Sequence, residues 1–437
     1  MTYATTTTPE RTISTQCCIV GGGPAGMMLG LLLARAGVRV AVLEKHQDFL
    51  RDFRGDTVHP STLEVLAELG LKQRFDSLPQ QRVEQLLVQF ADGVHPVVDF
   101  RGLKPFPYLA FVPQRDFLNF LADEATRYSG FELHMQTEVT DLLRVGGRIT
   151  GVRARTRDGD VAVHAQVVVG CDGRHSDVRA RTGLHVDDLG APMDVLWFQV
   201  PRYATDAAHS FGVAGRGSFM ALLDREDYWQ IAYVLRKGTV PELMAAPIDE
   251  FRAEVARRVA FLANRTHALA SWSDVKTLQV RVDRLRRWFE PGLLLIGDAA
   301  HAMSPIGGVG INLAIQDAVA AGNTLAPVLL RGLTPSVLDL ARVQMRRALP
   351  TRLVQALQIQ LQNRIIAPAL AAPRDAALPD MPVLLRGLLE LRAVRRIPAL
   401  VFGLGFQREH VRALPKQPRF TASEVTGPVP HVQQHHA

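Results

Sequence analysis

The apolar positions near the start of the chain form two short strand-like runs with a helix-like run between them. Residues 16–20 and 38–43 are apolar runs of strand length, and residues 24–36 form a helical stretch that stops at Gly37. A strand, a helix and a second strand in this order make one βαβ unit with a short crossover. The pattern therefore predicts an α/β fold with parallel strands.

Two later pairs of apolar runs are separated by short polar segments that are typical of hairpin turns. Ala-Asp-Gly divides the runs at 83–90 and 94–100, and Arg-Asp-Gly-Asp divides those at 148–156 and 161–164. A further buried strand is expected at 167–170, just before the stretch CDGRHSDVR. The first part of the chain is thus predicted to combine a βαβ unit with hairpins.

The pattern changes in the middle of the chain. Strands alternate with turns between about residues 192 and 282, and the run at 228–235 alternates large apolar residues with polar or small ones. Such alternation indicates a half-buried antiparallel sheet. A buried-strand run returns at 293–296, and from Asn312 onward the pattern is helical and rich in Leu, Ala and Arg. The sequence therefore predicts one domain that is interrupted by a sheet insert.

The length and charge of the chain do not identify the class of protein, but they limit the kinds of partner that it is expected to bind. The 437 residues are enough for two or three domains, and 47% of them are hydrophobic, as in globular proteins. The formal net charge is +7, but the arginines are scattered except at 284–287 and 386–396, and no nucleic-acid-binding motif accompanies them. We therefore expect no nucleic-acid partner. The basic, amphipathic stretch at 384–406 is a candidate for weak membrane contact.

The cysteines and the chain ends indicate a cytoplasmic protein. Cys17, Cys18 and Cys171 have neither metal-ligand spacing nor a Cys-x-x-Cys pair, so we expect reduced thiols and no metal site. Residues 1–15 are polar and rich in threonine, which predicts a disordered start and not a secretion signal. No apolar run approaches the length that spans a bilayer. A flexible tail is expected at 421–437.

A glycine-rich turn follows the first predicted strand. Gly21, Gly23 and Gly26 have the G-x-G-x-x-G spacing between a strand and a helix, which is the context that a dinucleotide-binding turn requires. These glycines permit a tight turn, close approach of a pyrophosphate and close helix–strand packing. Glu44 ends the second strand, where a carboxylate accepts hydrogen bonds from a ribose diol and repels a 2′-phosphate. The motif therefore favours the adenosine of FAD or NAD.

A second glycine-rich stretch, LLLIGDAAHAMSPIGGVGINLAIQDA, begins at residue 293. Asp298 lies where a strand ends and can accept hydrogen bonds from ribityl hydroxyls. Gly307, Gly308 and Gly310 allow the backbone to run against a flat ring, and a helix that starts near Asn312 points its positive end at that ring. Together the two stretches predict that the chain holds both ends of an FAD molecule.

With these motifs, the chain resembles the group A (single-component) FAD-dependent aromatic hydroxylases, which share the p-hydroxybenzoate hydroxylase fold. The G-x-G-x-x-G run, the stretch CDGRHSDVR and the stretch GDAAHAMSP occur in the order of that family, and the resemblance covers about residues 16–327. It implies a Rossmann-like FAD-binding domain (GR2-type), an inserted antiparallel β-sheet domain for substrate and a helical C-terminal region. The expected division of the chain is a disordered N-terminus (1–15), the first part of the FAD-binding domain (16–186), the β-sheet substrate domain (187–290), the resumed FAD-binding domain (291–330), a helical C-terminal region (331–420) and a flexible tail (421–437).

The resemblance also implies individual cofactor contacts. Arg54 is expected near the FAD pyrophosphate, Gln114 against the flavin side chain, and Asp172 and Arg179 in a motif linked with both FAD and NAD(P)H. Val309 replaces a polar residue that the family often places between the glycines. The remaining residues that we expect to bind the cofactor are Pro24, Ala25, Lys45, Val139, Gly297, Ile311 and Asn312.

Three residues are expected to bear on catalysis. Pro305 is expected against the ring near the oxygen-reacting carbon, Gly310 in the loop that faces the ring, and His59 is a weak candidate for a base. His301 is expected to pack or to form structural hydrogen bonds. Aromatic residues of the insert, Trp197 among them, are candidates for either core or substrate lining.

The function implied by the resemblance is hydroxylation of a phenolic or polyketide-like aromatic molecule. NADPH or NADH reduces FAD, O2 adds to the ring, and a flavin C4a-hydroperoxide delivers one oxygen atom; the enzyme is expected as a monomer or homodimer. The alternatives are a related flavin epoxidase, halogenase or prenyl reductase. The Trp-x-Trp-x-Ile-Pro signature of flavin halogenases is absent. A non-catalytic basic protein bound to membrane or nucleic acid is the alternative from another class.

Overall fold

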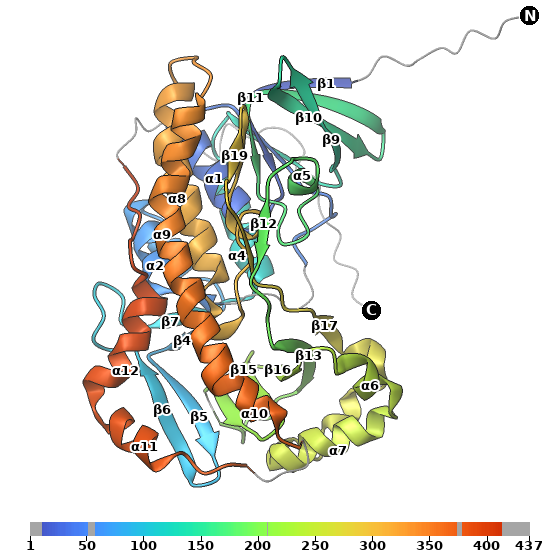
Figure 1. The fold of residues 1–437 in the computed structure, drawn as a ribbon, viewed down its shortest axis with the longest axis vertical. Coiled ribbons are helices and arrows are strands. Elements are labelled where there is room, and N and C mark those ends of the chain that lie inside the picture. The colour runs from blue at the N-terminus through green and yellow to red at the C-terminus, as the bar shows by residue number, and fades with distance from the viewer. Residues whose placement is uncertain (1–10, 51–56, 208, 374–377, 413–437) are drawn as a thin grey trace, which may run out of the picture.

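The computed structural model describes residues 11–50, 57–207, 209–373 and 378–412. Two large β-sheets lie at opposite ends of the molecule, and the long helices α8 (Gly310–Leu329) and α9 (Val337–Leu361) run along one side between them (Figure 1). The expected mixed α/β fold is thereby confirmed.

The first sheet has eight strands and contains the predicted βαβ unit. Its central strands are parallel in the order β20, β11, β1, β2, β8, while β19 and the β9–β10 hairpin pair antiparallel at its sides. The strands are β1 (Arg11–Val20), β2 (Val40–Leu43), β8 (Phe131–His134), β9 (Glu138–Val145), β10 (Arg148–Thr156), β11 (Gly159–Gly170), β19 (Phe289–Glu290) and β20 (Leu293–Leu295).

Helix α1 (Pro24–Ala36) is buried between this sheet and α8, because small residues allow close approach on both sides. A Cβ at Gly30 would lie 3.0 Å from the side chain of Val42 on β2, and one at Gly322 of α8 would lie 3.3 Å from Leu32. Val40 and Leu43 on β2 are also buried in this core. The packing fixes the start of α1 at the carboxyl ends of the parallel strands, where α/β sheets bind ligands.

The second sheet has seven strands and is larger than the predicted insert. The hairpin expected at 83–100 forms, but β14 pairs parallel with β5, so this hairpin joins the second sheet and not the first. The strands are β5 (Gln85–Phe90), β6 (Gly93–Asp99), β13 (Met193–Pro201), β14 (Phe211–Ala214), β15 (Phe219–Asp224), β16 (Tyr228–Arg236) and β17 (Lys276–Leu278).

Helices cover the second sheet, although the sequence pattern predicted strands and turns there. Phe251 and Val255 of α7 pack with Phe198 and Tyr233 on one face of the sheet. The helices not yet located are α2 (Pro60–Glu68), α3 (Lys72–Phe75), α4 (Gln114–Ala125), α5 (Asp177–Ala180), α6 (Val240–Ala245), α7 (Ile248–Arg258), α10 (Ala367–Ala371), α11 (Val383–Glu390) and α12 (Arg392–Pro398).

Two small sheets join segments that are distant in the sequence. Strand β7 pairs with β3 and β4, and β12 pairs with β18, in both cases antiparallel. The strands are β3 (Thr57–Val58), β4 (Gln81–Val83), β7 (Leu109–Phe111), β12 (Val186–Asp188) and β18 (Asp283–Leu285).

The chain start differs from the prediction of disorder through residue 15. Strand β1 begins at Arg11, and Thr12 and Thr15 pair with Ala162 and Ala165 of β11. The polar composition concealed a strand because β-branched threonine suits an extended chain and its hydroxyl can stay in solvent. The expected tail at 421–437 lies outside the described residues. Within the part of the chain that the structure describes, no helix is both long and apolar enough to cross a bilayer.

Candidate active site

The first glycine-rich turn links β1 to α1, and two of its glycines are required by the protein itself. Gly21 has φ 101°, and a Cβ there would lie 2.6 Å from the carbonyl oxygen of Cys171. A Cβ at Gly26 would collide with the carbonyl oxygen of Gly21. These two positions therefore fix the tight turn and the close contact between helix and strand.

Gly23 differs, because the described residues leave space beside it. The nearest atom to a Cβ at this position would be the carbonyl oxygen of Cys171, at 3.9 Å. Gly23 is also the N-cap of α1, and no side chain in the described ranges caps that helix. The first N–H groups of α1 and its positive dipole end thus face room for an anion such as a pyrophosphate.

Glu44 lies where β2 ends, as expected for a residue that binds a ribose. Glu44 is 5% exposed, and its carboxylate accepts hydrogen bonds from the backbone N–H of Gly22 at 2.9 Å and of His46 at 3.0 Å. The carboxylate is therefore held rigidly against the glycine turn. Its neighbour Lys45 is exposed, which permits contact with a ligand at the rim.

The second motif meets the first at Gly297. This glycine has φ 60°, and a Cβ there would lie 3.2 Å from the Cβ of Ala25 in α1 and 3.4 Å from that of Ala314 in α8. A larger residue would push these helices apart. The side chain of the next residue, Asp298, is 31% exposed. Two stretches more than 250 residues apart thus form one site, as the sequence predicted.

Arg174 also reaches this site, a contact that the sequence did not predict. Its Nη2 lies 3.5 Å from Oδ2 of Asp298, and its side chain is 16% exposed. The only signal in the sequence was its place in the CDGRHSDVR stretch. A partly buried guanidinium beside a strand-end carboxylate adds a positive group where phosphates and ribityl hydroxyls are expected.

The other residues of that stretch hold the site together. Oδ1 of Asp172 accepts from the hydroxyl of Ser176 at 2.6 Å, and its Oδ2 accepts from the N–H of Val178 at 3.0 Å, so this carboxylate caps the turn into α5. Burial raises the pKa of Asp172. Arg179 donates to the carbonyls of Arg174 at 2.7 Å and Ala299 at 3.2 Å. It therefore ties this stretch to the loop of Asp298.

The glycines after Pro305 are not equivalent. Gly307 and Gly308 have φ 75° and 61°; a Cβ at Gly307 would lie 3.2 Å from the ring of Phe402, and one at Gly308 would collide with Thr57. At Gly310, by contrast, no described atom lies within 4 Å of where a Cβ would be. The free space that a flat ring needs is thus next to Gly310, while the two preceding glycines are required by packing.

The start of α8 is braced by His59 and Thr62. The side-chain oxygen of Asn312 accepts from the N–H of His59 at 3.2 Å and from the hydroxyl of Thr62 at 2.6 Å. Ile311 and Asn312 are both buried in the first turn, so their backbones have a fixed place. The His59 ring lies against the backbones of Gly307, Gly308 and Phe402.

His59 itself is poorly placed to be a strong base. It is 1% exposed, and burial lowers its pKa from 6.5 to about 4. Neither of its ring nitrogens has a well-directed hydrogen bond to any residue that the structure describes. It is therefore neutral near pH 7, and its ring packs against the backbone of the glycine loop.

His301 is structural, as expected. Its Nε2 lies 2.6 Å from Oδ2 of Asp317, both side chains are buried, and its ring packs against Trp288 with the ring centres 4.9 Å apart. Pro305 is half-buried and begins the glycine loop.

Of the other expected cofactor contacts, Gln114 begins α4 and is half-buried. Val139 on β9 is buried in the main core. Pro24 and Ala25 form the first turn of α1. Arg54 lies outside the described residues.

Comparisons with known proteins agree with this geometry. The family model described as FAD binding domain matches residues 14–356. A curated relative, 6-methylpretetramide 4-monooxygenase of Streptomyces rimosus, is 35% identical over 328 residues, which cover 73% of this chain and 76% of that protein. The chain belongs to the group A FAD-dependent aromatic hydroxylases. It is a monooxygenase that uses FAD, NAD(P)H and O2.

Other similar proteins extend this comparison. Dialkyldecalin synthase of Streptomyces rugosporus is 28% identical over 325 residues, covering 74% of this chain and 67% of that protein. The crystal structure of p-nitrophenol 4-monooxygenase from Pseudomonas putida matches with a TM-score of 0.72 at 20% identity, over 91% of this chain and all of the other. The similarity to p-nitrophenol 4-monooxygenase shows that the two chains share a fold.

The residues of the monooxygenase fit FAD along its length. Glu44 suits the adenosine ribose, the open position at Gly23 and the start of α1 suit the pyrophosphate, and Asp298 suits the ribityl hydroxyls. The first turn of α8 beside Gly310 can donate N–H groups to negative charge on the ring. When bound, FAD supplies hydride acceptance and oxygen activation. The chain supplies the position of the cofactor and the charges and N–H groups around it.

Proposed function

We propose that the monooxygenase hydroxylates a planar phenolic substrate of the polyketide type, which lies between the loop at 305–308 and the second sheet. The observation that carries this proposal is the position of Trp197. Its side chain packs in an apolar cluster that also contains Ile306 of the loop and Ile366 after α9. The described fold thus places this aromatic ring in the same apolar cluster as a residue of the loop that is expected to face the flavin.

The two faces of β13 separate core from candidate substrate lining. Phe198 and its neighbours Trp229 and Tyr233 on β16 pack against α7 and are buried. Trp197 points to the opposite face, since side chains alternate along a strand. Of these aromatic residues, Trp197 is therefore the one that we assign to the substrate.

Small residues leave room beside Trp197. It is paired across the sheet with Ala232, and Ala232 is paired with Ala221 on β15. A tryptophan next to two alanines makes a flat apolar surface that suits a flat ring system. The name of the relative 6-methylpretetramide 4-monooxygenase supports a polycyclic aromatic substrate.

The test is a panel of single-ring phenols and polycyclic phenols, each assayed for NAD(P)H oxidation and for product mass. We expect polycyclic phenols to accelerate NAD(P)H oxidation and to gain one oxygen. Trp197→Leu should raise KM for these substrates by about tenfold, because an aromatic contact is lost.

Phe198→Leu is the matched control. It removes an aromatic ring from the next residue of the same strand, but on the face toward α7. This variant should lose stability and keep its KM. A preference for single-ring phenols, or equal KM changes in both variants, would contradict the assigned substrate site.

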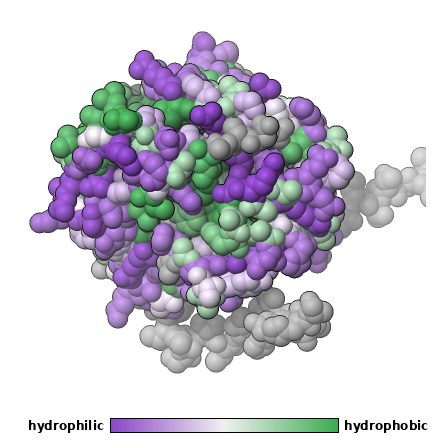
Figure 2. Space-filling view, turned by 90° about the horizontal axis from the view of Figure 1, so that it is seen from below, coloured by the Kyte–Doolittle hydropathy of each residue, from purple (hydrophilic) through white to green (hydrophobic). Residues whose placement is uncertain are grey.

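We further propose that helices α11 and α12 touch an anionic membrane surface. Val383 and Leu384 are 85% and 78% exposed, and Leu388, Leu391 and Ile397 extend the apolar surface. The exposed Arg392 and Arg396 belong to α12, the helix that also carries Ile397. Apolar residues gather in patches on the lower end of the molecule, among hydrophilic ones (Figure 2). An apolar surface with an arginine border suits lipid headgroups of negative charge.

Vesicle sedimentation tests this contact. The protein should sediment with phosphatidylglycerol vesicles and not with phosphatidylcholine vesicles, and Leu384→Glu should abolish the binding. Leu349→Glu, at a position on α9 that is 61% exposed, is the control and should still bind. Equal binding by both variants would contradict this surface.

The three cysteines are buried free thiols, which supports the expected cytoplasmic location.

A further inference from the structure

We propose that Asp317 and Arg347 form a positioning link through which the C-terminal segment, residues 407–412, holds the backbone of Gly297 and Asp298 in its FAD-binding place. The inference rests on FAD as the cofactor and is independent of the proposed substrate. It assigns a role to buried charges that the chemistry at the flavin does not use.

Asp317 is the centre of the link. It lies on α8 and is completely buried. Its Oδ2 accepts a hydrogen bond from the N–H of Gly297 at 3.1 Å and contacts Nε2 of His301 at 2.6 Å. Gly297 precedes Asp298 directly, so the Asp317 carboxylate holds the peptide that carries the ribityl-binding residue.

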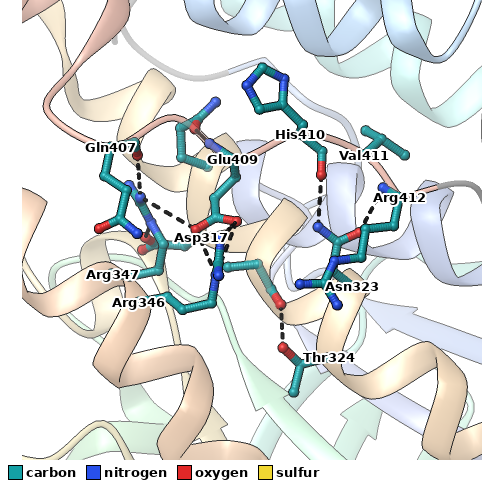
Figure 3. A network of polar contacts seen from close by, with 12 residues as sticks. Asp317, Asn323, Thr324, Arg346, Arg347, Gln407, Glu409, His410, Val411 and Arg412 are labelled. Atoms are coloured by element: carbon teal, nitrogen blue, oxygen red, sulfur yellow. Dashed lines mark hydrogen bonds and ion pairs between the residues drawn. The ribbon is translucent and has the colours of Figure 1, made fainter.

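Arg347 connects Asp317 to the end of the described chain. This α9 residue is 1% exposed; its Nε lies 3.0 Å from Oδ1 of Asp317, and its Nη1 donates to the carbonyl of Gln407 at 2.9 Å (Figure 3). Its Nη1 is also 4.0 Å from the buried carboxylate of Glu409. One guanidinium thus bridges α8 and the C-terminal segment, which its planar fork of donors permits.

The C-terminal segment is itself fixed to α8 and α2. The Asn323 side chain donates to the carbonyl of His410 at 2.8 Å and accepts from the N–H of Arg412 at 3.0 Å (Figure 3). The N–H of Val411 donates to Glu68 of α2 at 2.7 Å. A segment held at both helices gives Arg347 a rigid anchor, so the position of Asp317 does not depend on α8 alone.

Arg346 provides a natural control. It also binds Glu409, with Nη2 2.7 Å from Oε2, but its side chain is 41% exposed. Among the described residues, the side chain of Arg346 forms hydrogen bonds and an ion pair with Glu409, so it does not extend the link to Asp317. Loss of Arg346 removes an ion pair between α9 and the same segment, and it leaves the contacts of the Asp317 carboxylate that holds Gly297 in place.

The experiment measures FAD dissociation constants on apoprotein, urea unfolding of the apoprotein, and visible circular dichroism of the bound flavin. Asp317→Asn and Arg347→Gln should each weaken FAD binding by about tenfold or more, since a charge-assisted contact is lost. The visible circular dichroism of the bound flavin should also change in these two variants. Arg346→Gln should leave both the dissociation constant and the dichroism unchanged.

A double-variant cycle separates positioning from general stability. If Asp317 acts through Asp298, then Asp317→Asn should cost much less FAD affinity in an Asp298→Asn background than in the natural protein. Arg347→Lys keeps the charge and serves if Arg347→Gln does not fold; it should weaken FAD binding less than tenfold but measurably. Additive effects in the cycle, or variants that lose stability but bind FAD as before, would overturn the proposal.

Discussion

At the residue scale, the first glycine-rich turn contains glycines of two kinds. A side chain at Gly26 would collide with the backbone of Gly21, whereas a Cβ at Gly23 would be 3.9 Å from the nearest described protein atom. The protein therefore needs Gly26 in order to fold, and the ligand needs Gly23. This difference allows cofactor binding to be disturbed without disturbing the apoprotein.

We predict that Gly23→Ala keeps the stability of the apoprotein and weakens FAD binding by about tenfold or more, because the methyl group occupies the space of the pyrophosphate. Gly26→Ala should destabilise apoprotein and holoprotein alike. Urea unfolding and FAD titration of both variants check this. Unchanged FAD affinity in Gly23→Ala would contradict the position of the phosphates.

His59 makes a prediction about pH. Its pKa is about 4 in the fold against 6.5 in the unfolded chain. Between these pH values the unfolded state therefore binds more protons than the folded state. The stability that the neutral His59 contributes is fully present above pH 6.5 and is lost as the pH falls toward 4. The difference corresponds to about 3 kcal/mol of the free energy of unfolding.

His59→Gln should accordingly flatten the pH dependence of unfolding between pH 7 and pH 4.5. The measurement is urea unfolding of both proteins across that interval. Identical slopes for the two proteins would show that the imidazole is not kept neutral by burial. The same buried position is why we assign His59 to support of the loop at 307–308.

At the element scale, α5 is held to the rest of the site by a buried charge. Nη1 of Arg179 lies 3.3 Å from Oδ1 of Asp283 on β18, and the two side chains are 9% and 2% exposed. Arg179 also bonds the loop that contains Ala299. Removal of one partner of a buried ion pair leaves the other charge uncompensated.

Arg179→Met should therefore lower the free energy of unfolding by about 3–5 kcal/mol. Arg155→Met is the control, since its pair with Asp160 is 66% and 65% exposed, and it should cost less than about 1 kcal/mol. Urea unfolding of the apoproteins gives both values. A stable Arg179→Met variant with altered NAD(P)H affinity alone would instead assign Arg179 to the co-substrate.

At the scale of the whole molecule, the two glycine-rich stretches meet at Gly297, so we predict one FAD per chain. Denaturation of the purified protein should release one equivalent of FAD and no FMN, because Glu44 and the turn at 21–26 serve an adenosine diphosphate. Product formed under labelled dioxygen should gain one labelled oxygen atom. Release of FMN, or label that comes from water, would contradict the function.

The sequence by itself determined the local features of the cofactor site. The glycine spacing at 21–26, Glu44 at a strand end and Asp298 after the buried strand at 293–296 are requirements of backbone conformation and local chemistry. Such requirements involve only a few neighbouring residues, so they can be recognised along the chain. The strand–helix–strand order at 16–43 likewise predicted the parallel pairing of the first two strands.

Tertiary structure decided which distant segments meet. The hairpin at 85–99 forms as its pattern predicts, yet its pairing with β14 depends on a strand more than 100 residues away. Likewise, alternation along β13 shows that Trp197 and Phe198 face opposite ways, but only the packing of α7 decides which face is core. The approach of Arg174 to Asp298, and the link from Gln407 through Arg347 to Gly297, also join residues that no local pattern connects. Hydrophobic periodicity and turn residues are local properties of the chain. Which segments pair with one another depends on how much apolar surface the whole fold can bury and how many buried charges it can pair.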